Sequence, residues 1–343
     1  MGSANRKALI YDPYWDSLGG GEKYMATIAK VLADSNFAVD IYWPTNISQS
    51  VIDRFGIDLT GCHFVTKYST HDYDLVFWNS DGSLPFSLAK KTFINMQFPH
   101  HGVSGHKILN LIKSKFYTFL ANSNFTKSVI DREYWVNSHV LYPPIRTNDF
   151  KIGPKFKQIL YVARFSNLAQ VKGHEILIQS FKNIYKQIPE WKLILAGNTN
   201  IGTTDESFSR LKDLAEGLPI EFIINPDLTD LKKLYSRASI FWSGSGYGID
   251  QRLHPEKVEH FGMTVVEAMS AGCVPIIVNL GGHPEIVNHS EDGYLWDETN
   301  MLEKQTLELI ADIQKMSYLS KLAQNKAYVF DEDKFKVKLL ELI

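Results

Sequence analysis

Short apolar runs, separated by segments with helical spacing of apolar residues, recur along the whole chain. In the first half these runs are KALIYDP, VDIYWP, DLVFWNS, TFINMQF, YTFLANS and HVLYPP. Continuous apolar runs of about four to eight residues are typical of buried parallel strands. The alternation of such runs with helical patterns therefore predicts a doubly wound α/β domain with a parallel sheet.

The same alternation begins again after a break near the middle of the chain. Tyr142-Pro143-Pro144 ends the regular pattern, and the polar segment from Arg146 to Lys157 has the composition of a linker. The second series of strands is predicted at KQILYVARF, KLILAG, IEFIINP and IFWSG. We expect Rossmann-like domains over residues 1–150 and 151–325. We expect a C-terminal helical segment over 326–343, and one possible arrangement has it packed against the first domain.

A glycine-rich loop follows the first predicted strand. Gly19, Gly20, Gly21 and Glu22 open the next predicted helix, and glycines let a backbone approach an anion at a helix N-terminus. The spacing matches neither the dinucleotide fingerprint nor the Walker pattern, so the loop is either a phosphate site or a plain tight turn. Two such sheets facing each other are expected to bind ligands in a cleft at the carboxyl ends of their strands.

The stretch EKVEHFGMTVVEAMSAG combines two carboxylates with the start of a helix. Its apolar residues predict a helix that begins near Gly262 and exposes unpaired backbone N–H groups. Glu259 precedes this helix and Glu267 lies within it, and a carboxylate accepts hydrogen bonds from two neighbouring sugar hydroxyls. A nucleotide sugar offers both a diphosphate and vicinal hydroxyls, so this stretch is a candidate nucleotide-sugar site.

Composition and charge narrow the class of protein. The 343 residues are 44% hydrophobic and 22% charged, as expected of a globular protein with two domains. The net charge of -2 gives no basic surface for nucleic acid. No run approaches the roughly 20 apolar residues that span a bilayer, and MGSANRK has no apolar core of a secretory signal. We predict a cytoplasmic protein.

No metal site is predicted. Cys62 and Cys273 are far apart, and His254, His283 and His289 show no H-E-x-x-H pairing. An Asp-x-Asp motif at a strand end, as a metal-dependent transferase needs, is also missing.

Three blocks resemble the signatures of one enzyme family. ARFSNLAQVKGHEILIQSF is similar to the strand, Arg, loop, Lys-Gly, helix signature of family 4 retaining glycosyltransferases, with Arg164 and Lys172 in the places of its basic pair. The spacing of Glu259 and Glu267 resembles the second signature, and ANSNFTKSVI followed by YPP resembles a third. GYGIDQRLHPEKVEHFGMTVVEAM particularly resembles the branch of lipid-linked oligosaccharide mannosyltransferases and their bacterial relatives.

The resemblance implies a GT-B fold and retaining, metal-independent transfer of a hexose, with mannose as one option. It implies a GDP- or UDP-sugar donor, no cofactor, and a glycan or lipid-linked acceptor. Arg164 and Lys172 would stabilise the charge that grows on the departing diphosphate. Glu267 would bind the ribose, and Glu259 the transferred sugar. The same comparison places next to the donor Gly20, Gly21 and the backbone of His260, Phe261, Gly262, Met263 and Thr264.

One departure from the family leaves alternatives open. Many relatives carry a His near the acceptor where this chain has Gln97, which cannot be protonated. Either the family's His is not needed as a base, or His100 or His101 replaces it. The alternatives are a catalytically inactive nucleotide-sugar-binding partner subunit, or a GT-B enzyme of another type such as an epimerase.

The segment HKILNLIKSKFYTFL, from His106 to Leu120, mixes lysines with apolar residues at helical spacing. We favour a core-packed helix with a solvated lysine face, and the alternative is peripheral association with the inner face of a membrane. The sequence gives no prediction of the oligomeric state.

Overall fold

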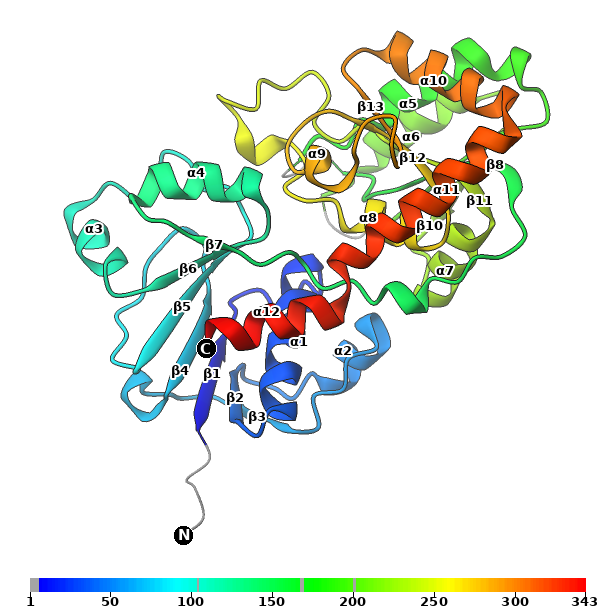
Figure 1. Ribbon diagram of the computed structural model, residues 1–343. Helices are drawn as coiled ribbons and strands as arrows, with labels where there is room; N and C mark the ends of the chain where they lie inside the picture. Colours follow the sequence, from blue (N-terminus) through cyan, green and yellow to red (C-terminus); the bar gives the residue numbers. More distant parts are fainter. Residues whose placement is uncertain (1–5, 104, 167–169, 200–201) are drawn as a thin grey trace. The chain divides into compact units, whose positions relative to one another are not determined.

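The structure, a computed structural model, describes residues 6–343 except for 104, 167–169 and 200–201. It divides into two compact units, unit 1 with Met1–Pro144 and Asp333–Ile343 and unit 2 with Ile145–Glu332. Each unit is a parallel sheet with helices, which confirms the predicted fold class (Figure 1).

Unit 1 contains a seven-stranded parallel sheet in the order β3-β2-β1-β4-β5-β6-β7. Its strands are β1 (Lys7–Tyr11), β2 (Ala38–Tyr42), β3 (Cys62–Val65), β4 (Leu75–Asn79), β5 (Lys91–Met96), β6 (Thr118–Ala121) and β7 (His139–Val140). Its helices are α1 (Gly20–Asp34), α2 (Ser48–Phe55), α3 (Ile108–Ser114), α4 (Asn124–Tyr134) and α12 (Glu332–Leu342), with a short 3-10 turn η1 (Thr70–Asp72).

The two faces of the unit 1 sheet are buried by different helices. Ala8 and Ile10 of β1 belong to a core formed with α1, α2 and α12, whereas Leu9 belongs to a smaller cluster on the opposite face. Ile94 of β5 packs with α4 on that second face. This division follows from the alternation of side chains along a strand.

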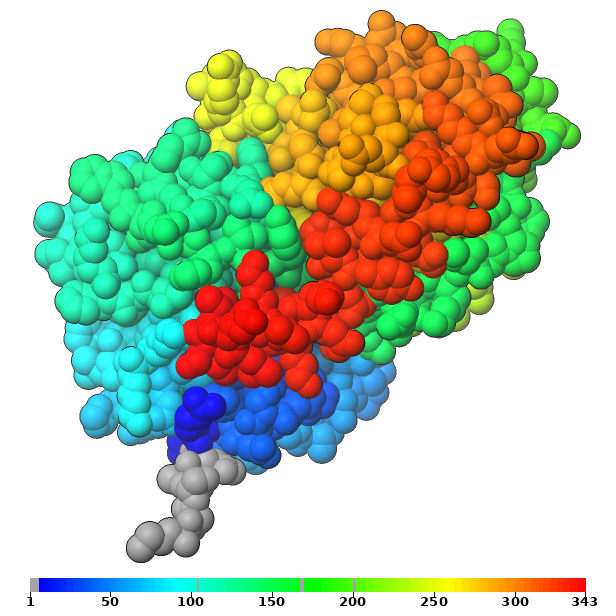
Figure 2. Space-filling model, in the orientation of Figure 1, coloured from blue at the N-terminus to red at the C-terminus, as the bar shows by residue number. Residues whose placement is uncertain are grey.

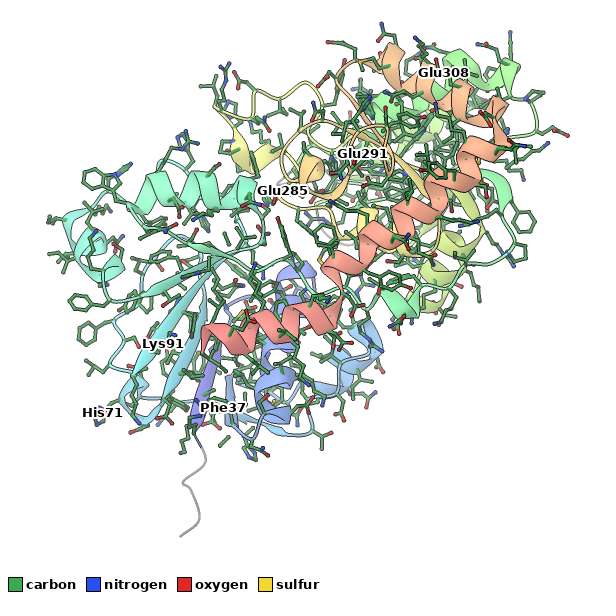
Figure 3. The ribbon with its side chains drawn as sticks, viewed as in Figure 1. Phe37, His71, Lys91, Glu285, Glu291 and Glu308 are labelled. Carbon is green, nitrogen blue, oxygen red and sulfur yellow. The ribbon has the colours of Figure 1, made fainter. Side chains whose placement is uncertain are left out.

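The C-terminal helix α12 packs on unit 1. Phe335 meets the ring of Tyr24 edge-on with centroids 5.2 Å apart. Lys91 of β5, labelled in Figure 3, donates a hydrogen bond to the carbonyl of Leu342. The space-filling view shows this helix in red beside blue residues of unit 1 (Figure 2). The two ends of the chain therefore contribute to the same core.

Unit 2 contains a six-stranded parallel sheet in the order β10-β9-β8-β11-β12-β13, the strand order of a Rossmann fold. Its strands are β8 (Phe156–Val162), β9 (Lys192–Gly197), β10 (Ile220–Ile224), β11 (Ala238–Ser243), β12 (Val274–Val278) and β13 (Tyr294–Trp296). Its helices are α5 (His174–Ile184), α6 (Asp205–Ala215), α7 (Leu228–Arg237), α8 (Met263–Ser270), α9 (His283–Ile286), α10 (Thr299–Ala311) and α11 (Ile313–Ala327). Four 3-10 turns complete the described elements, η2 (Thr147–Asp149), η3 (Tyr185–Gln187), η4 (Pro255–Lys257) and η5 (Tyr328–Phe330).

Each sheet has one point at which the strand order reverses. In unit 1 this switch point lies between β1 and β4, and in unit 2 it lies between β8 and β11. Open α/β sheets bind ligands outside the carboxyl ends of the strands at such points. The loops that follow these four strands are therefore where ligand-binding side chains are expected.

The preference for a core-packed helix near Lys113 is wrong. Ile108, Leu109 and Ile112 of α3 are exposed, as is Phe116 just after the helix. Their helical spacing identified the helix correctly, but no other part of unit 1 that the structure describes covers this face. No helix in the described part of the chain has the length and apolar character needed to cross a bilayer.

Candidate active site

The loops after β8 and β11 meet at the switch point of unit 2. Arg164 is half-buried two residues after β8, and Lys172 comes just before α5. Between Lys172 and that helix, Gly173 has φ +71°, and a Cβ there would lie 2.4 Å from the carbonyl oxygen of Gly244, which follows β11. Only glycine permits both this backbone conformation and this close approach, so Gly173 joins the two loops.

Lys172 forms an ion pair with Glu259. Its Nζ lies 2.9 Å from Glu259 Oε2 and also donates to Gln170 Oε1 at 2.6 Å, and the two charged side chains are 9% and 20% exposed. Burial acts to raise the pKa of Glu259, but the charge and hydrogen bond of Lys172, together with His283 and His260, outweigh it and hold the pKa at about 2. Glu259 is therefore a carboxylate at neutral pH.

The backbone that carries Glu259 is clamped by two glycines. Gly281 has φ +61°, and a Cβ there would lie 2.0 Å from the carbonyl oxygen of Glu259. The N–H of Gly282 donates to that oxygen at 2.8 Å. The position of Glu259 is thus fixed by its main chain as well as by Lys172.

The residues between Glu259 and α8 divide into core and backbone roles. Phe261 is buried and meets Phe330 edge-on at 5.3 Å, so its side chain belongs to the core. The ring of His260 lies 3.2 Å from the carbonyl oxygen of Glu256. Gly262 precedes α8, and the first N–H groups of this helix, those of Met263 and Thr264, have no acceptor within it.

Glu267 in α8 is oriented by a tyrosine that the sequence patterns did not identify. The hydroxyl of Tyr235 in α7 donates to Glu267 Oε2 at 3.0 Å, and Tyr235 is fully buried. Burial and the neighbouring carboxylate raise the pKa of Tyr235 well above its ordinary value. The phenol therefore stays protonated and remains a hydrogen-bond donor to Glu267.

A buried histidine beneath this segment was also missed. His283 Nδ1 lies 3.0 Å from the carbonyl oxygen of Val278, and burial lowers its pKa to about 4. Lys172 is the largest of the groups that lower the pKa of Glu259, and the nearby rings of His283 and His260 add to its effect. Neither Tyr235 nor His283 belongs to a sequence motif that would have indicated a functional role. Gln170 could have been found, because it lies only two residues before the predicted site residue Lys172.

In unit 1, the structure brings Gln97 together with the glycine loop. Gly20 and Gly21 are the first residues of α1, and Gln97 directly follows β5. Gln97 Oε1 lies 3.9 Å from the position of a Cβ on Gly21, and the Gln97 carbonyl accepts from Asn122 Nδ2 at 3.0 Å. Glu22 accepts a hydrogen bond from the N–H of Gly19, so a carboxylate already occupies the N-terminus of α1.

The two candidate histidines after β5 have different surroundings. His100 Nε2 lies 3.3 Å from the carbonyl oxygen of Ser80, and burial lowers the pKa of this ring. A neutral His100 that donates from Nε2 keeps its lone pair on Nδ1. His101 is exposed.

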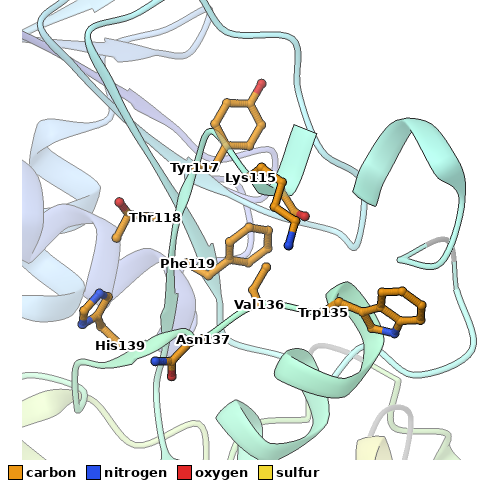
Figure 4. Close-up of a pocket in the computed structure, with 9 residues that line it drawn as sticks. Lys115, Tyr117, Thr118, Phe119, Trp135, Val136, Asn137 and His139 are labelled. Carbon is orange, nitrogen blue, oxygen red and sulfur yellow. The ribbon is translucent and has the colours of Figure 1, made fainter. Parts of the chain in front are cut away.

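A cavity of about 290 Å³ lies beside β6 and β7, at one edge of the unit 1 sheet (Figure 4). Thr118 and His139, the first residues of β6 and β7, line it together with Lys115 and Trp135. The cavity is thus at the amino ends of its strands, away from the switch point, and we do not assign the chemistry to it. Among the residues that the structure describes, no group of three His, Cys, Asp or Glu side chains is placed to hold a metal ion.

Comparison with known protein families identifies the family to which this chain belongs. Residues 145–326, nearly the whole of unit 2, match the family described as Glycosyl transferases group 1. The chain belongs to the group 1 glycosyltransferases. Arg164, Lys172, Glu259 and Glu267 of this glycosyltransferase all lie inside the matched region, and the predicted family is confirmed.

The relatives agree with the branch that the sequence resembles. A protein of Dictyostelium discoideum, named GDP-Man:Man(3)GlcNAc(2)-PP-Dol alpha-1,2-mannosyltransferase, is 24% identical over 279 residues, which cover 70% of this chain and 52% of that protein. This glycosyltransferase spans about half the length of the curated relatives it matches.

Solved structures confirm the GT-B fold. A glycosyltransferase from Rickettsia africae ESF-5 superposes with a TM-score of 0.80 at 18% identity, covering 99% of this chain and 98% of that one. Anabaena Alr3699/HepE, solved in complex with UDP, gives a TM-score of 0.74 at 18% identity and covers 99% of both chains.

Proposed function

We propose that this protein is a retaining, metal-independent glycosyltransferase that moves a hexose from a nucleotide sugar to a glycan or lipid-linked acceptor. The observation that carries the proposal is the cationic group at the switch point of unit 2, inside the region that matches the family. Arg164, Lys172 and the N-termini of α5 and α8 supply positive charge or N–H donors there.

The proposed chemistry depends on stabilising the departing diphosphate. Breaking the bond between the sugar and the nucleotide adds negative charge to the phosphate oxygens, so preorganised positive charge lowers the barrier. Lys172 is held by Gln170 and Glu259 and needs no rearrangement to present its ammonium group. Positive side chains in this role make a metal ion unnecessary.

The two glutamates are proposed to bind hydroxyl groups. Glu267, fixed by Tyr235 through one oxygen, would accept hydrogen bonds from the ribose. Glu259 would accept from the transferred sugar while it also holds Lys172. In this proposal the leaving phosphate takes the acceptor proton from the same face, so retention needs no covalent intermediate on either glutamate.

The donor is proposed to be a GDP-sugar or a UDP-sugar, with GDP-mannose first. The name of the Dictyostelium relative contains GDP-Man, and the Anabaena structure contains UDP. The low identity to both leaves the nucleotide to experiment.

Association with a membrane surface is proposed from the exposed side chains of unit 1. Ile108 is 70% exposed and Phe116 is 78% exposed, and the exposed Lys107 and Lys115 flank them. Phe86, 74% exposed, belongs to a neighbouring loop, since Lys113 donates to the carbonyl of Leu84 at 2.8 Å. Exposed apolar side chains flanked by lysines match the interface of a bilayer with anionic lipids. The cytoplasmic location stays a prediction.

Incubation with a panel of GDP- and UDP-sugars tests the enzymatic proposal. We expect slow hydrolysis of one donor in the absence of acceptor, at a rate that EDTA does not change. Lys172→Ala should lower turnover by about tenfold or more, since it removes charge that matters most as the phosphate departs.

Two outcomes would contradict the proposal. Tight binding of a nucleotide sugar without turnover of any donor would fit a catalytically inactive binding subunit. Loss of activity with EDTA, restored by a divalent cation, would overturn the metal-independent mechanism.

A further inference from the structure

The switch point of unit 1 contains buried polar atoms that lack partners. Asp12 directly follows β1 and has no exposed surface. Its Oδ1 accepts from the N–H of Tyr14 at 3.0 Å, but its Oδ2 has no hydrogen-bond partner among the described residues. The Nε2 of Gln97 is buried in the same way, without an acceptor in the described part of the structure.

These side chains converge on the first turn of α1. The side chain of Asn79, the last residue of β4, forms a hydrogen bond with Asp12. Asn79 Nδ2 and Gln97 Oε1 lie 3.8 and 3.9 Å from the position of a Cβ on Gly21. The carboxyl ends of β1, β4 and β5 thus bring one carboxyl and two amides to the N-terminus of a fifteen-residue helix.

The charged groups at the switch point of unit 1 differ in sign from the cations Arg164 and Lys172 at the switch point of unit 2. Burial raises the pKa of Asp12 to about 7, repulsion from Glu22 and Asp16 adds to it, and the bonds from Asn79 and Tyr14 oppose it. The charged groups that act on Asp12 are therefore acidic. A phosphate placed here would meet two nearby carboxyl groups, Asp12 and Glu22, and no compensating cation among them.

Folded proteins rarely keep a buried polar atom without a partner unless water or a ligand satisfies it. Asp12 Oδ2 accepts a hydrogen bond and Gln97 Nε2 donates one, and a hydroxyl group can serve both. Both atoms are shielded from solvent, so a ligand would have to displace Gln97 or the glycine loop locally to reach them.

We propose that Asp12, Asn79 and Gln97 form a subsite for a hydroxyl group of a neutral, carbohydrate-like acceptor. This inference rests on the proposed glycosyl transfer and identifies where the acceptor binds on unit 1. Asp12 accepts the hydrogen bond from the ligand hydroxyl, and Gln97 donates to its oxygen. The amide of Gln97 thus serves in binding, and no protonatable group is needed at that position.

The test compares Asp12→Asn with the wild-type chain in three measurements. These are hydrolysis of the donor in water, transfer to octyl glycosides of mannose, glucose and N-acetylglucosamine, and the Kd for GDP and UDP. Saturation-transfer NMR records binding of the same octyl glycosides. At pH 8, where the Asp12 carboxyl is mostly ionised, we expect transfer and glycoside binding to fall about tenfold or more, because a hydrogen bond to a charged group is lost. Hydrolysis and nucleotide Kd should stay within about twofold.

Stability separates a ligand-binding role from a structural one. A carboxyl whose pKa is raised from 3.8 to about 7 by folding destabilises the folded state increasingly as pH rises through that interval. Asp12→Asn removes this penalty, so its melting temperature should exceed that of the wild type most at pH 8, with the difference shrinking toward pH 4. A residue that only supports the fold would lose stability on substitution.

A matched control comes from unit 2. Asp292 is also a buried carboxyl with a pKa raised by burial, and it accepts from the N–H of Asn288 at 2.8 Å, outside both switch points. Asp292→Asn should leave transfer and glycoside binding unchanged.

Several results would overturn the inference. Unchanged transfer in Asp12→Asn would mean that a water molecule alone fills the site, and tighter GDP binding would place the phosphates beside Asp12. Equal loss of hydrolysis and transfer would assign Asp12 to the donor. A wild-type chain that hydrolyses a donor but neither binds nor glycosylates any glycoside counts against the inference alone. Failure to turn over any donor would instead contradict the proposed function.

Discussion

At the scale of single residues, the two switch points place carboxyl groups in opposite environments. Glu259 shares a buried ion pair with Lys172, which keeps its pKa at about 2. Burial, with added repulsion from acidic neighbours, raises the pKa of Asp12 to about 7. Under the proposed function, the first arrangement would hold a carboxylate and a cation beside a diphosphate ligand, and the second would favour a neutral ligand.

Tyr235 is predicted to act as a positioning residue for Glu267. Tyr235→Phe removes the hydrogen bond to a partly buried carboxylate, worth about 1.5–3 kcal/mol for a charged acceptor. The donor KM should therefore rise by about tenfold or more with little change in kcat, because ribose binding is equally strong in the ground state and the transition state. Steady-state kinetics with the active donor measure both.

A double-mutant cycle and a control distinguish positioning from general destabilisation. In a Glu267→Ala background, Tyr235→Phe should add little to the loss of donor binding. Tyr24→Phe removes an equally buried hydroxyl in unit 1, which donates to the carbonyl of Leu141 at 3.0 Å, and should leave donor KM unchanged. Additive losses in the cycle would show that Tyr235 acts independently of Glu267.

The sequence predicted candidate site residues from their spacing within single segments. Lys172 and Glu259, taken from two such segments, do meet in the structure. The Tyr235–Glu267 bond depends on how α7 packs against α8, and no local pattern specifies that packing. Asp12 carried a signal that was overlooked, because it is a carboxylate at the end of the first strand of a sheet.

At the scale of secondary-structure elements, the positions of the strands were easier to predict than which helix faces are buried by other elements. The apolar runs gave β1 and β8 directly, but β3 is short and only partly buried, so its sequence lacks a continuous apolar run. The apolar spacing of α3 indicated a helix, but spacing does not determine whether anything covers the apolar face. Whether this apolar face is covered depends on where α4 and the loop at Leu84 lie.

The exposed face of α3 predicts binding to anionic membranes. Leu109→Glu combined with Ile112→Glu places negative charge in this face and should reduce co-sedimentation with phosphatidylserine-containing vesicles by about tenfold or more, because apolar insertion and lysine attraction are both weakened. Neutral phosphatidylcholine vesicles should bind the wild-type chain less, and salt should weaken binding to the anionic ones.

Ile313 supplies the matched control for the membrane experiment. It is 77% exposed at the start of α11 in unit 2, so Ile313→Glu makes the same kind of change on a helix outside unit 1. Equal loss of vesicle binding in both variants, or no binding by the wild-type chain, would contradict the membrane proposal.

At the scale of the whole molecule, each unit has its own sheet, its own core and its own switch point. The apolar alternation along the chain was sufficient to predict two parallel sheets, because buried parallel strands have a strong and local signal. The return of α12 to unit 1 depends on contacts such as Tyr24 with Phe335, which lie at opposite ends of the chain. The account assigns the nucleotide to unit 2 and a neutral acceptor to unit 1.

Hydrogen exchange with and without GDP or UDP tests this central assignment most directly. The account predicts that the bound nucleotide slows amide exchange in peptides that contain the start of α5 and residues 259–267, where the N–H donors and both glutamates lie. Arg164→Ala should weaken this protection at a fixed nucleotide concentration. Protection confined to Gly19–Glu22 and the end of β4 in unit 1, with none in unit 2, would contradict the account.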